Sequence, residues 1–222
     1  MKRIIFLSLI VMIAFLGCET TQPQTKVNEV DKKENVSDAL KYYDFAKEYL
    51  KNKQFDSAVK NYTNAINDSA DFIDAYVGLG KSYEGKLDYT RAESVFTVAR
   101  DKFPKSTAGN NGLGTLYLKL KQYDNAEAAF LKALSIDSVD ARSYYGLGQV
   151  YDKKKPTVKD LTSLKCFEKA CKFDPEDLAA AYAYSKALMK AEKYKDAVDL
   201  LKKVSDDHPT FVEPLSNLAE AY

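Results

Sequence analysis

The sequence lacks the residues from which most catalytic and metal sites are built. Its 222 residues include no tryptophan, one histidine and three cysteines. The cysteines, Cys18, Cys166 and Cys171, are too few for a disulfide framework, and with one histidine they give no ligand set at zinc-like spacing. Cys166 and Cys171 are five residues apart, which on one helix points them in different directions, so we expect both to be small buried side chains. We therefore predict no catalytic residue, no metal site and no small-molecule substrate.

An excess of charge of either sign is also missing. Lys and Arg total 33 and Asp and Glu total 32, giving a formal net charge of +1 at pH 7. A nucleic-acid-binding protein needs a basic surface that neutralises phosphates, and no run of like charges provides one. We therefore exclude nucleic acid as a partner. The hydrophobic content of 45% is sufficient for one ordinary globular or repeat domain.

The longest apolar stretch lies at the N-terminus. Lys2 and Arg3 precede a largely apolar segment from Ile4 to Leu16, which Gly17 and Cys18 follow. This segment is too short to span a bilayer comfortably, and its basic start and small residue before the break are typical of a secretory signal. From residue 19 to residue 38 the sequence is polar and has no apolar period, which indicates a flexible tether.

The segment from Phe15 to Cys18 resembles the lipobox of bacterial lipoproteins, although Phe15 and Leu16 depart from the residues that the lipobox prefers. The resemblance implies a signal peptide over 1–17 and a covalent lipid on Cys18, with the tether over 18–38. No other cofactor is expected. Acyl chains alone would then hold the protein on the membrane. The alternative is an uncleaved signal anchor that contains an incidental cysteine.

From residue 40 onward a pattern recurs with a period of 34 residues. Alanine recurs at Ala58, Ala92, Ala126 and Ala197 and again at Ala65, Ala99, Ala133 and Ala170. A small residue recurs at Ala46, Gly80, Gly114, Gly148 and Ser185, and a large residue recurs at Tyr62, Phe96, Phe130, Phe167 and Leu201. Small side chains allow two helices to approach closely while large ones fill the space beside them.

This pattern resembles the tetratricopeptide repeat. The second unit matches it throughout, at Tyr76, Leu79, Gly80, Tyr83, Ala92, Phe96, Ala99 and Pro104. The resemblance implies an all-α fold, a right-handed superhelical solenoid of antiparallel helix pairs over 39–222. Its units are 39–72, 73–106, 107–140, 141–177 and 178–211, with a partial unit over 212–222. The fourth unit has three extra residues around Pro156, which lengthen the loop inside that pair. The partial unit either caps the solenoid or marks a sequence that continues.

In the resembled family the first helix of each unit lines a concave groove that holds a protein or peptide. The fifth positions of the units, which face that groove, are Tyr43, Val77, Asn111, Tyr145 and Tyr182. Four residues later the same face presents Lys47, Lys81, Thr115, Gln149 and Lys186. Tyrosine is enriched at binding hot spots, so we predict an aromatic, mildly basic groove. The alternative is that these tyrosines only cover neighbouring helices. The set of residues that clamps a terminal carboxylate in some such proteins is missing, since Tyr43, Gly78 and Gly112 occupy its positions.

Together these features predict a membrane-anchored scaffold of the bacterial cell envelope, an outer-membrane lipoprotein that faces the periplasm. It resembles lipoproteins that act as pilotins of type IV pili, as assembly factors for outer-membrane β-barrels or as adaptors for cell-wall hydrolases, and nothing in the sequence selects among them. Two alternatives stay open. The sequence is the non-catalytic N-terminal part of a longer cell-wall enzyme or peptidoglycan-binding protein, or the lipoprotein is exposed on the cell surface.

Overall fold

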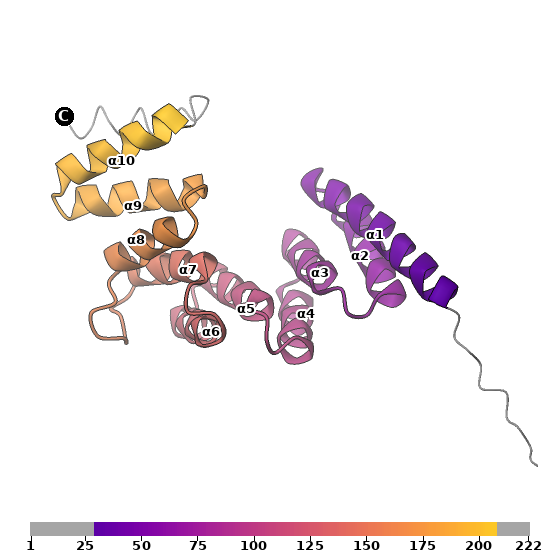
Figure 1. Cartoon of the computed structure of the whole chain (residues 1–222). Helices are drawn as coiled ribbons and strands as arrows, with labels where there is room; N and C mark the ends of the chain where they lie inside the picture. The colour runs from indigo at the N-terminus through magenta and orange to yellow at the C-terminus, as the bar shows by residue number, and fades with distance from the viewer. Residues whose placement is uncertain (1–28, 208–222) are drawn as a thin grey trace, which may run out of the picture.

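The computed structural model describes residues 29–207, and within that range it consists of α-helices joined by turns and loops, without strands (Figure 1). The helices are α1 (Glu29–Lys51), α2 (Phe55–Asp68), α3 (Ile73–Gly85), α4 (Tyr89–Lys102), α5 (Ala108–Lys119), α6 (Tyr123–Ile136), α7 (Ala141–Tyr151), α8 (Ser163–Phe173), α9 (Leu178–Lys190) and α10 (Tyr194–Asp207). The predicted signal peptide over 1–17, the lipidated Cys18 and the partial unit over 212–222 lie outside the described residues.

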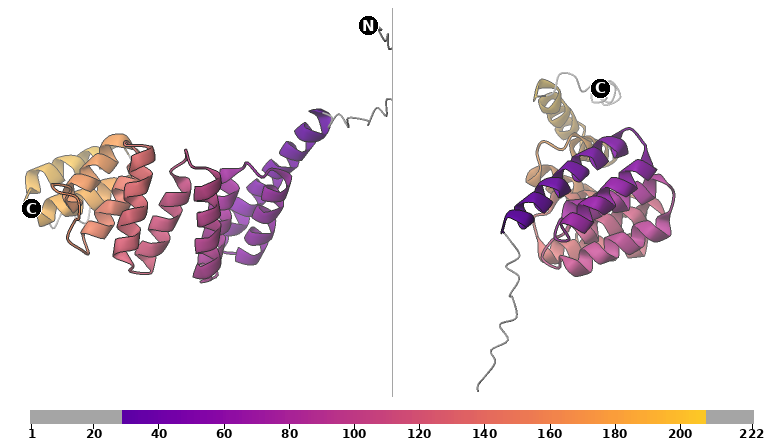
Figure 2. Two further views of the ribbon diagram at one scale, coloured as in Figure 1. Left: turned by 90° about the horizontal axis from the view of Figure 1, so that it is seen from below. Right: turned by 90° about the vertical axis from the view of Figure 1, so that its right-hand side faces the viewer.

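Each helix packs against the next one along the chain, so that α1 pairs with α2, α3 with α4, and so on to α9 with α10. The pairs stack into an elongated, curved body in which α1 and α10 lie at opposite ends (Figure 2). The predicted all-α solenoid of antiparallel helix pairs is therefore confirmed. Because each pair buries its apolar faces only against its neighbours, the stack forms no central globular core.

The predicted end of the tether at residue 38 was wrong, because α1 already begins at Glu29. Residues 29–38 have no apolar face, which is why their sequence suggested a coil. They contain several Glu and Lys residues, which are good helix formers. Adding residues to the end of an existing helix costs much less free energy than nucleating one, and the packed part of α1 provides that nucleus.

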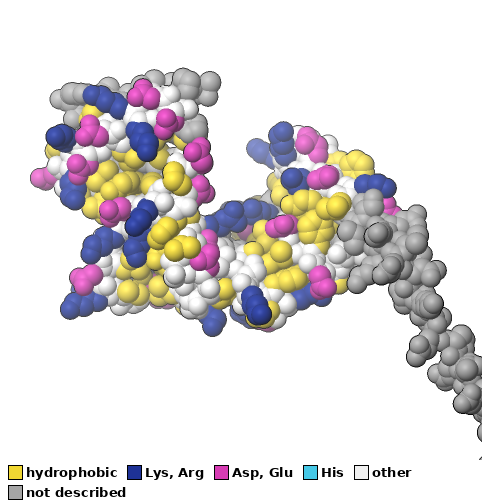
Figure 3. All heavy atoms as spheres, viewed as in Figure 1, with side chains coloured by type: hydrophobic (Ala, Val, Ile, Leu, Met, Phe, Trp, Pro, Cys, Tyr) yellow, Lys and Arg dark blue, Asp and Glu magenta, His cyan; other side chains and the backbone are white. Residues whose placement is uncertain are grey.

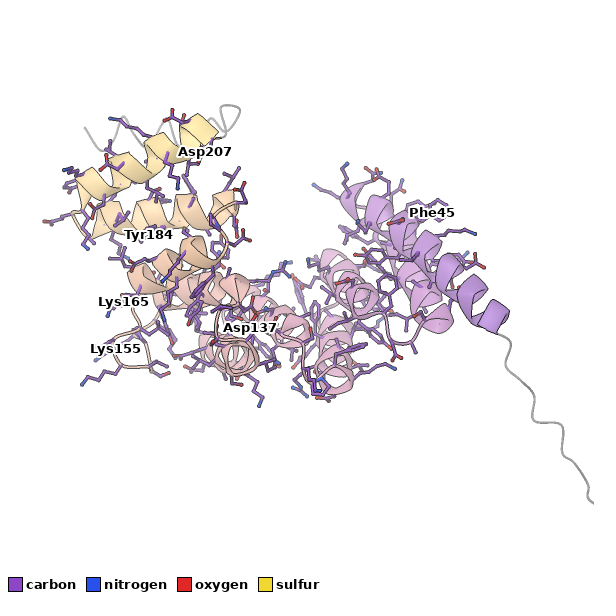
Figure 4. All side chains as sticks on the ribbon, in the orientation of Figure 1. Phe45, Asp137, Lys155, Lys165, Tyr184 and Asp207 are labelled. Atoms are coloured by element: carbon purple, nitrogen blue, oxygen red, sulfur yellow. The ribbon has the colours of Figure 1, made fainter. Side chains whose placement is uncertain are left out.

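Most pairs have the same tight connection between their two helices. In four of the five pairs a three-residue turn joins the helices, and its middle residue has a left-handed backbone: Lys53, Leu87, Lys121 and Glu192, with φ between 58° and 62°. The fourth unit instead has a loop over residues 152–162 between α7 and α8. The predicted lengthening of this connection is confirmed. Lys155 lies on the part of this loop that extends away from the helices (Figure 4).

The core of the stack is a series of aromatic rings held between glycines. A Cβ atom added to Gly80 or to Gly112 would lie 2.4 Å from the ring of Phe96, and one added to Gly114 or Gly146 would lie 2.7 or 2.2 Å from the ring of Phe130. Each ring therefore fills the space left by a glycine of its own unit and by a glycine of the next unit. The recurring small residues do mark close helix contacts, as we predicted, on one side of the ring. The glycine on its other side, Gly112 or Gly146, lies two residues before that recurring position.

The recurring alanines are buried within the described range, and Cys166 is buried as predicted, whereas Cys171 is only half-buried; both cysteines are free thiols. One column changes its environment along the stack. Leu79, Leu113 and Leu147 are at most 8% exposed, but the equivalent Phe45 is 59% exposed on the outer face of α1 (Figure 4). The structure describes no helix that covers α1 on that side, so Phe45 lacks the neighbour that buries the leucines.

Candidate binding groove

The predicted groove residues lie along three adjoining cavities in the described part of the chain. All ten line at least one of them. The N-terminal cavity, of about 630 Å³, is lined by Tyr43, Lys47, Val77 and Lys81 among others. The central cavity, of about 360 Å³, is lined by Val77, Lys81, Asn111, Thr115, Tyr145 and Gln149. The C-terminal cavity, of about 720 Å³, is lined by Tyr145, Tyr182 and Lys186. Because neighbouring cavities share residues, they form one continuous concave path.

At the N-terminal cavity, Tyr43 has a packing role as well as an accessible face. Its ring centroid lies 4.6 Å from that of Phe72 and 5.8 Å from that of Tyr62, and the Lys47 Nζ lies 5.4 Å from the Tyr43 ring centroid. Partial burial raises the pKa of the Tyr43 hydroxyl, and the nearby Asp74 adds to this effect. Tyr43 therefore covers neighbouring helices and lines the cavity at the same time, so the two alternatives raised by the sequence both describe it.

At the central cavity Asn111 lies at a predicted groove position, and its side chain is engaged within the protein. Asn111 is only 3% exposed. Its Nδ2 donates a hydrogen bond to Asp140 at 2.5 Å, and its Oδ1 accepts one from the Ser143 hydroxyl at 2.7 Å. Thr115 likewise donates its hydroxyl proton to the Asn111 carbonyl of its own helix, at 2.8 Å. Buried polar groups need such partners, so the Asn111 side chain fixes α5 against the start of α7, whereas the Thr115 hydroxyl is bonded within α5.

The C-terminal cavity is the largest of the three and has mostly apolar walls. Tyr145 lies beside Phe167, with ring centroids 5.9 Å apart, and α9 contributes the small side chains of Ala179, Ala183 and Ala187. Lys186 lies over the ring of Tyr182, with its Nζ 5.5 Å from the ring centroid. Burial raises the pKa of the Tyr145 hydroxyl, and Asp177 adds to the effect. A pocket with apolar walls and a few hydroxyl and ammonium groups suits an apolar side chain of a partner.

The surface view shows where apolar and basic side chains lie around the hollow (Figure 3). Apolar side chains lie on both sides of the hollow between the α9 and α1 ends, and basic side chains gather between them. The cavities are also lined by residues that were not predicted from the sequence, Phe167 and Arg142 among them. Phe167 lines the C-terminal cavity, and Arg142 lines both the N-terminal and the central cavity. Arg142 precedes Tyr145 by one helical turn, so extending the predicted face by one turn toward the N-terminus would have included it.

Neither a membrane-spanning helix nor a metal site is formed by the described residues. Between residues 29 and 207, no helix combines the length and apolar character needed to cross a bilayer. The same residues include no group of three or more His, Cys, Asp or Glu side chains placed to hold a metal ion.

Comparison with known proteins identifies the repeats and finds the same fold in solved structures. A family model described as "Tetratricopeptide repeat" matches residues 43–107, and one described as "TPR repeat" matches residues 114–155. Superkiller protein 3 of Saccharomyces cerevisiae is 26% identical over 159 residues, which cover 69% of this chain and 11% of that protein. The chain spans between 9% and 23% of the length of the curated relatives it matches.

Solved structures share the fold at low identity. Yeast Tom70 is 20% identical with a TM-score of 0.72, and the similarity covers 85% of this chain and 40% of that one. The pilF protein of Pseudomonas aeruginosa is 17% identical with a TM-score of 0.62, and the similarity covers 85% of this chain and 99% of that one. The groove and the stacked pairs define a helical-repeat scaffold for protein–protein interaction. More particularly, the chain carries tetratricopeptide repeats, and proteins built from these repeats are generally non-catalytic scaffolds.

Proposed function

We propose that this chain is a lipid-anchored scaffold of the bacterial cell envelope, facing the periplasm from the outer membrane, which holds a segment of a partner protein in its groove. The observation that carries the proposal is the continuity of the three cavities along the first helices. Val77 and Lys81 are shared by the first two cavities and Tyr145 by the last two. A path of this kind fits an extended polypeptide segment better than it fits a compact small molecule.

The anchor is the second part of the proposal, and it is supported by the basic start, the apolar stretch and Cys18 of the sequence. Two or more acyl chains would provide stable attachment, since each buried methylene adds about 0.8 kcal/mol of membrane affinity. The structural similarity to the pilF protein of Pseudomonas aeruginosa extends over 99% of that solved chain.

A photocrosslinking experiment tests the groove. A photoreactive phenylalanine analogue replaces Tyr145 or Tyr182 in the full chain, expressed in its own cells. Tyr194 is the matched control, because it is a tyrosine, is 50% exposed and lines none of the three cavities. We expect the same partner to be crosslinked from Tyr145 and Tyr182 and not from Tyr194. Crosslinks that arise only from Tyr194 would show that the groove is not the binding surface.

Fractionation of the same cells tests the anchor. We expect the wild-type chain in the membrane fraction with an incorporated labelled fatty acid, because the thiol of Cys18 is the predicted attachment point. The variant Cys18→Ser should lose the label and leave the membrane fraction once the signal is removed. Cys171→Ser is the control, since Cys171 is a free, half-buried thiol of α8. Retention of the label in Cys18→Ser would contradict lipidation at this residue.

A further inference from the structure

Two cations from distant parts of the sequence meet at the middle of the groove. Lys81 lies on α3 in the second unit, and Arg142 lies on α7 in the fourth unit. Both side chains line the N-terminal cavity and the central cavity, so they stand where these two cavities join. They are close enough for the charge of Arg142 to act on Lys81, although the third unit lies between their helices along the chain.

Neither cation of this pair is neutralised by an ion pair of its own. None of the ion pairs in the described residues includes Lys81 or Arg142. Five acidic residues line the same two cavities: Glu48 and Asp74 in the N-terminal one, and Glu84, Asp174 and Asp177 in the central one. Glu84 is paired with Lys119 at 3.2 Å, and none of the five lies within ion-pair distance of Lys81 or Arg142. The repulsion between the two like charges is therefore not offset by an ion pair of either one.

Two further features add to this positive potential. Arg142 is the second residue of α7, at the positive end of the helix dipole, and the Asp140 carboxylate that caps this end accepts the backbone N–H of Arg142 at 3.2 Å and offsets part of that charge. The walls of the groove displace water around the Lys81 ammonium, and this desolvation, followed by the charge of Arg142, lowers the pKa of Lys81. Glu84 and Asp74 act in the opposite direction but do not cancel these effects. An anion that entered between the two cations would relieve both unfavourable terms at once.

The groove continues on both sides of the cation pair. Toward α1 lies the N-terminal cavity with Tyr43, and toward α9 the central cavity leads through Tyr145 to the apolar C-terminal cavity. A chain bound here can therefore pass the cations in both directions. This geometry favours an acidic side chain within an extended segment over the terminal carboxylate of a chain that ends there.

We infer that Lys81 and Arg142 together bind the carboxylate of an internal Asp or Glu in an extended partner segment, and that an apolar side chain of the same segment occupies the C-terminal cavity. Guanidinium and ammonium groups that face one carboxylate provide charge-assisted hydrogen bonds, which are about twice as strong as neutral ones. This inference rests on the proposed function, because it specifies the chemistry of the segment that the groove holds.

A peptide selection tests the inference. A phage-displayed library of random dodecapeptides is selected against the full 222-residue chain in detergent, and the most enriched peptide is synthesised with an amidated C-terminus. We expect an Asp or Glu at a fixed internal position with an apolar residue on one side. Its affinity should fall about tenfold in Lys81→Met and in Arg142→Met. Lys132→Met, an exposed lysine of α6 outside the three cavities, should bind as the wild type does.

Replacing the peptide's acidic residue by its amide completes a double-mutant cycle. The amide should bind the wild type about tenfold more weakly and should bind Lys81→Met with little further loss. Equal losses in both proteins would overturn the inference, as would peptides without an internal acid or binding that requires a free C-terminus. If Tyr145→Ala and Tyr182→Ala abolish binding while the two cation variants do not, only this inference fails. A library that yields no peptide dependent on any of these four residues contradicts the proposed function as well. Circular dichroism spectra of each variant verify its folding.

Discussion

Two junctions between successive units use equivalent positions in opposite ways. At the closed junction, between α6 and α7, Gly146 faces the ring of Phe130, and a Cβ there would lie 2.2 Å from that ring. At the open junction, between α8 and α9, the residues in the same positions are Phe167 and Ala183, and both line the 720 Å³ cavity. The first helices α5 and α7 lie in contact, whereas α7 and α9 make at most marginal contact. The open junction has the methyl group of Ala183 where the closed junction has only the hydrogen of Gly146. This difference is consistent with a gap between α7 and α9 that is wide enough for a ligand side chain.

Polar contacts differ between the two junctions as well. The closed junction contains Glu127, which is 3% exposed and accepts hydrogen bonds from the Tyr151 hydroxyl at 2.6 Å and from Lys154 at 2.8 Å. Thr157 of the long loop also donates its backbone N–H to Glu127 at 3.0 Å. The positions equivalent to Glu127 and Tyr151 at the open junction are Leu164 and Leu188, neither of which can form such a bond. Glu127 and Tyr151 thus stabilise the closed junction and hold the long loop against it. The open junction depends on apolar packing instead.

Removing Glu127 should change the stability of the closed junction more than any other substitution proposed below. Glu127→Ala leaves the Tyr151 hydroxyl and the Lys154 ammonium without their partner, and we expect the free energy of unfolding to fall by about 3 kcal/mol. The control is Glu93→Ala one unit earlier, where the half-buried carboxylate accepts the Tyr117 hydroxyl alone, at 2.6 Å, and where we expect a loss of about 1 kcal/mol. Urea denaturation measures both. Equal losses would show that the loop contacts add nothing.

Acid should weaken the closed junction through the same carboxylate. Burial by itself acts to raise the pKa of Glu127, but the hydrogen bonds from Lys154, Thr157 and Tyr151 outweigh it and lower the pKa from 4.5 to about 2. A lowered pKa means that the folded state favours the ionised form, so this stabilisation is complete above pH 4.5 and is lost as the pH falls toward 2. We expect a loss on the order of 2 kcal/mol over that range. The slope of stability against pH there should be smaller in Glu127→Ala.

Exchanging the residues that face the rings should have a smaller effect. Gly146→Ala gives the closed junction the alanine that the open junction has at Ala183. Overpacking against the buried Phe130 ring should lower the free energy of unfolding by about 1 to 2 kcal/mol, despite the better helix propensity of alanine. The reciprocal control, Ala183→Gly, removes a methyl group that lines the C-terminal cavity and should cost no more than about 1 kcal/mol. Thermal unfolding followed by circular dichroism compares the two. A stabilised Gly146→Ala variant would show that the ring moves aside without cost.

The recurring columns predicted the fold correctly because the same few contacts are repeated in every unit, so each position is supported by several observations. Features that occur once had no such support. The position of Arg142 beside Lys81 depends on the curvature of the whole stack, and the network around Glu127 depends on the path of a single loop. Asn111 matched a groove position by its spacing, but its bonds to Asp140 and Ser143 involve a neighbouring unit. The start of α1 was missed because its first residues have no apolar face to mark them.

The glycine-flanked rings also determine how the chain should come apart. Since the rings of Phe96 and Phe130 are each enclosed by two successive units, neither unit can unfold without exposing a ring that its neighbour needs. Units two to four should accordingly melt as one cooperative block. At the open junction no ring is enclosed by glycines of two units, so α9 and α10 can unfold without the preceding units. Their amide hydrogens should therefore exchange with solvent before those of α3 to α7. The end of the molecule that offers the largest cavity is thus also the part that can rearrange around a guest without loosening the rest.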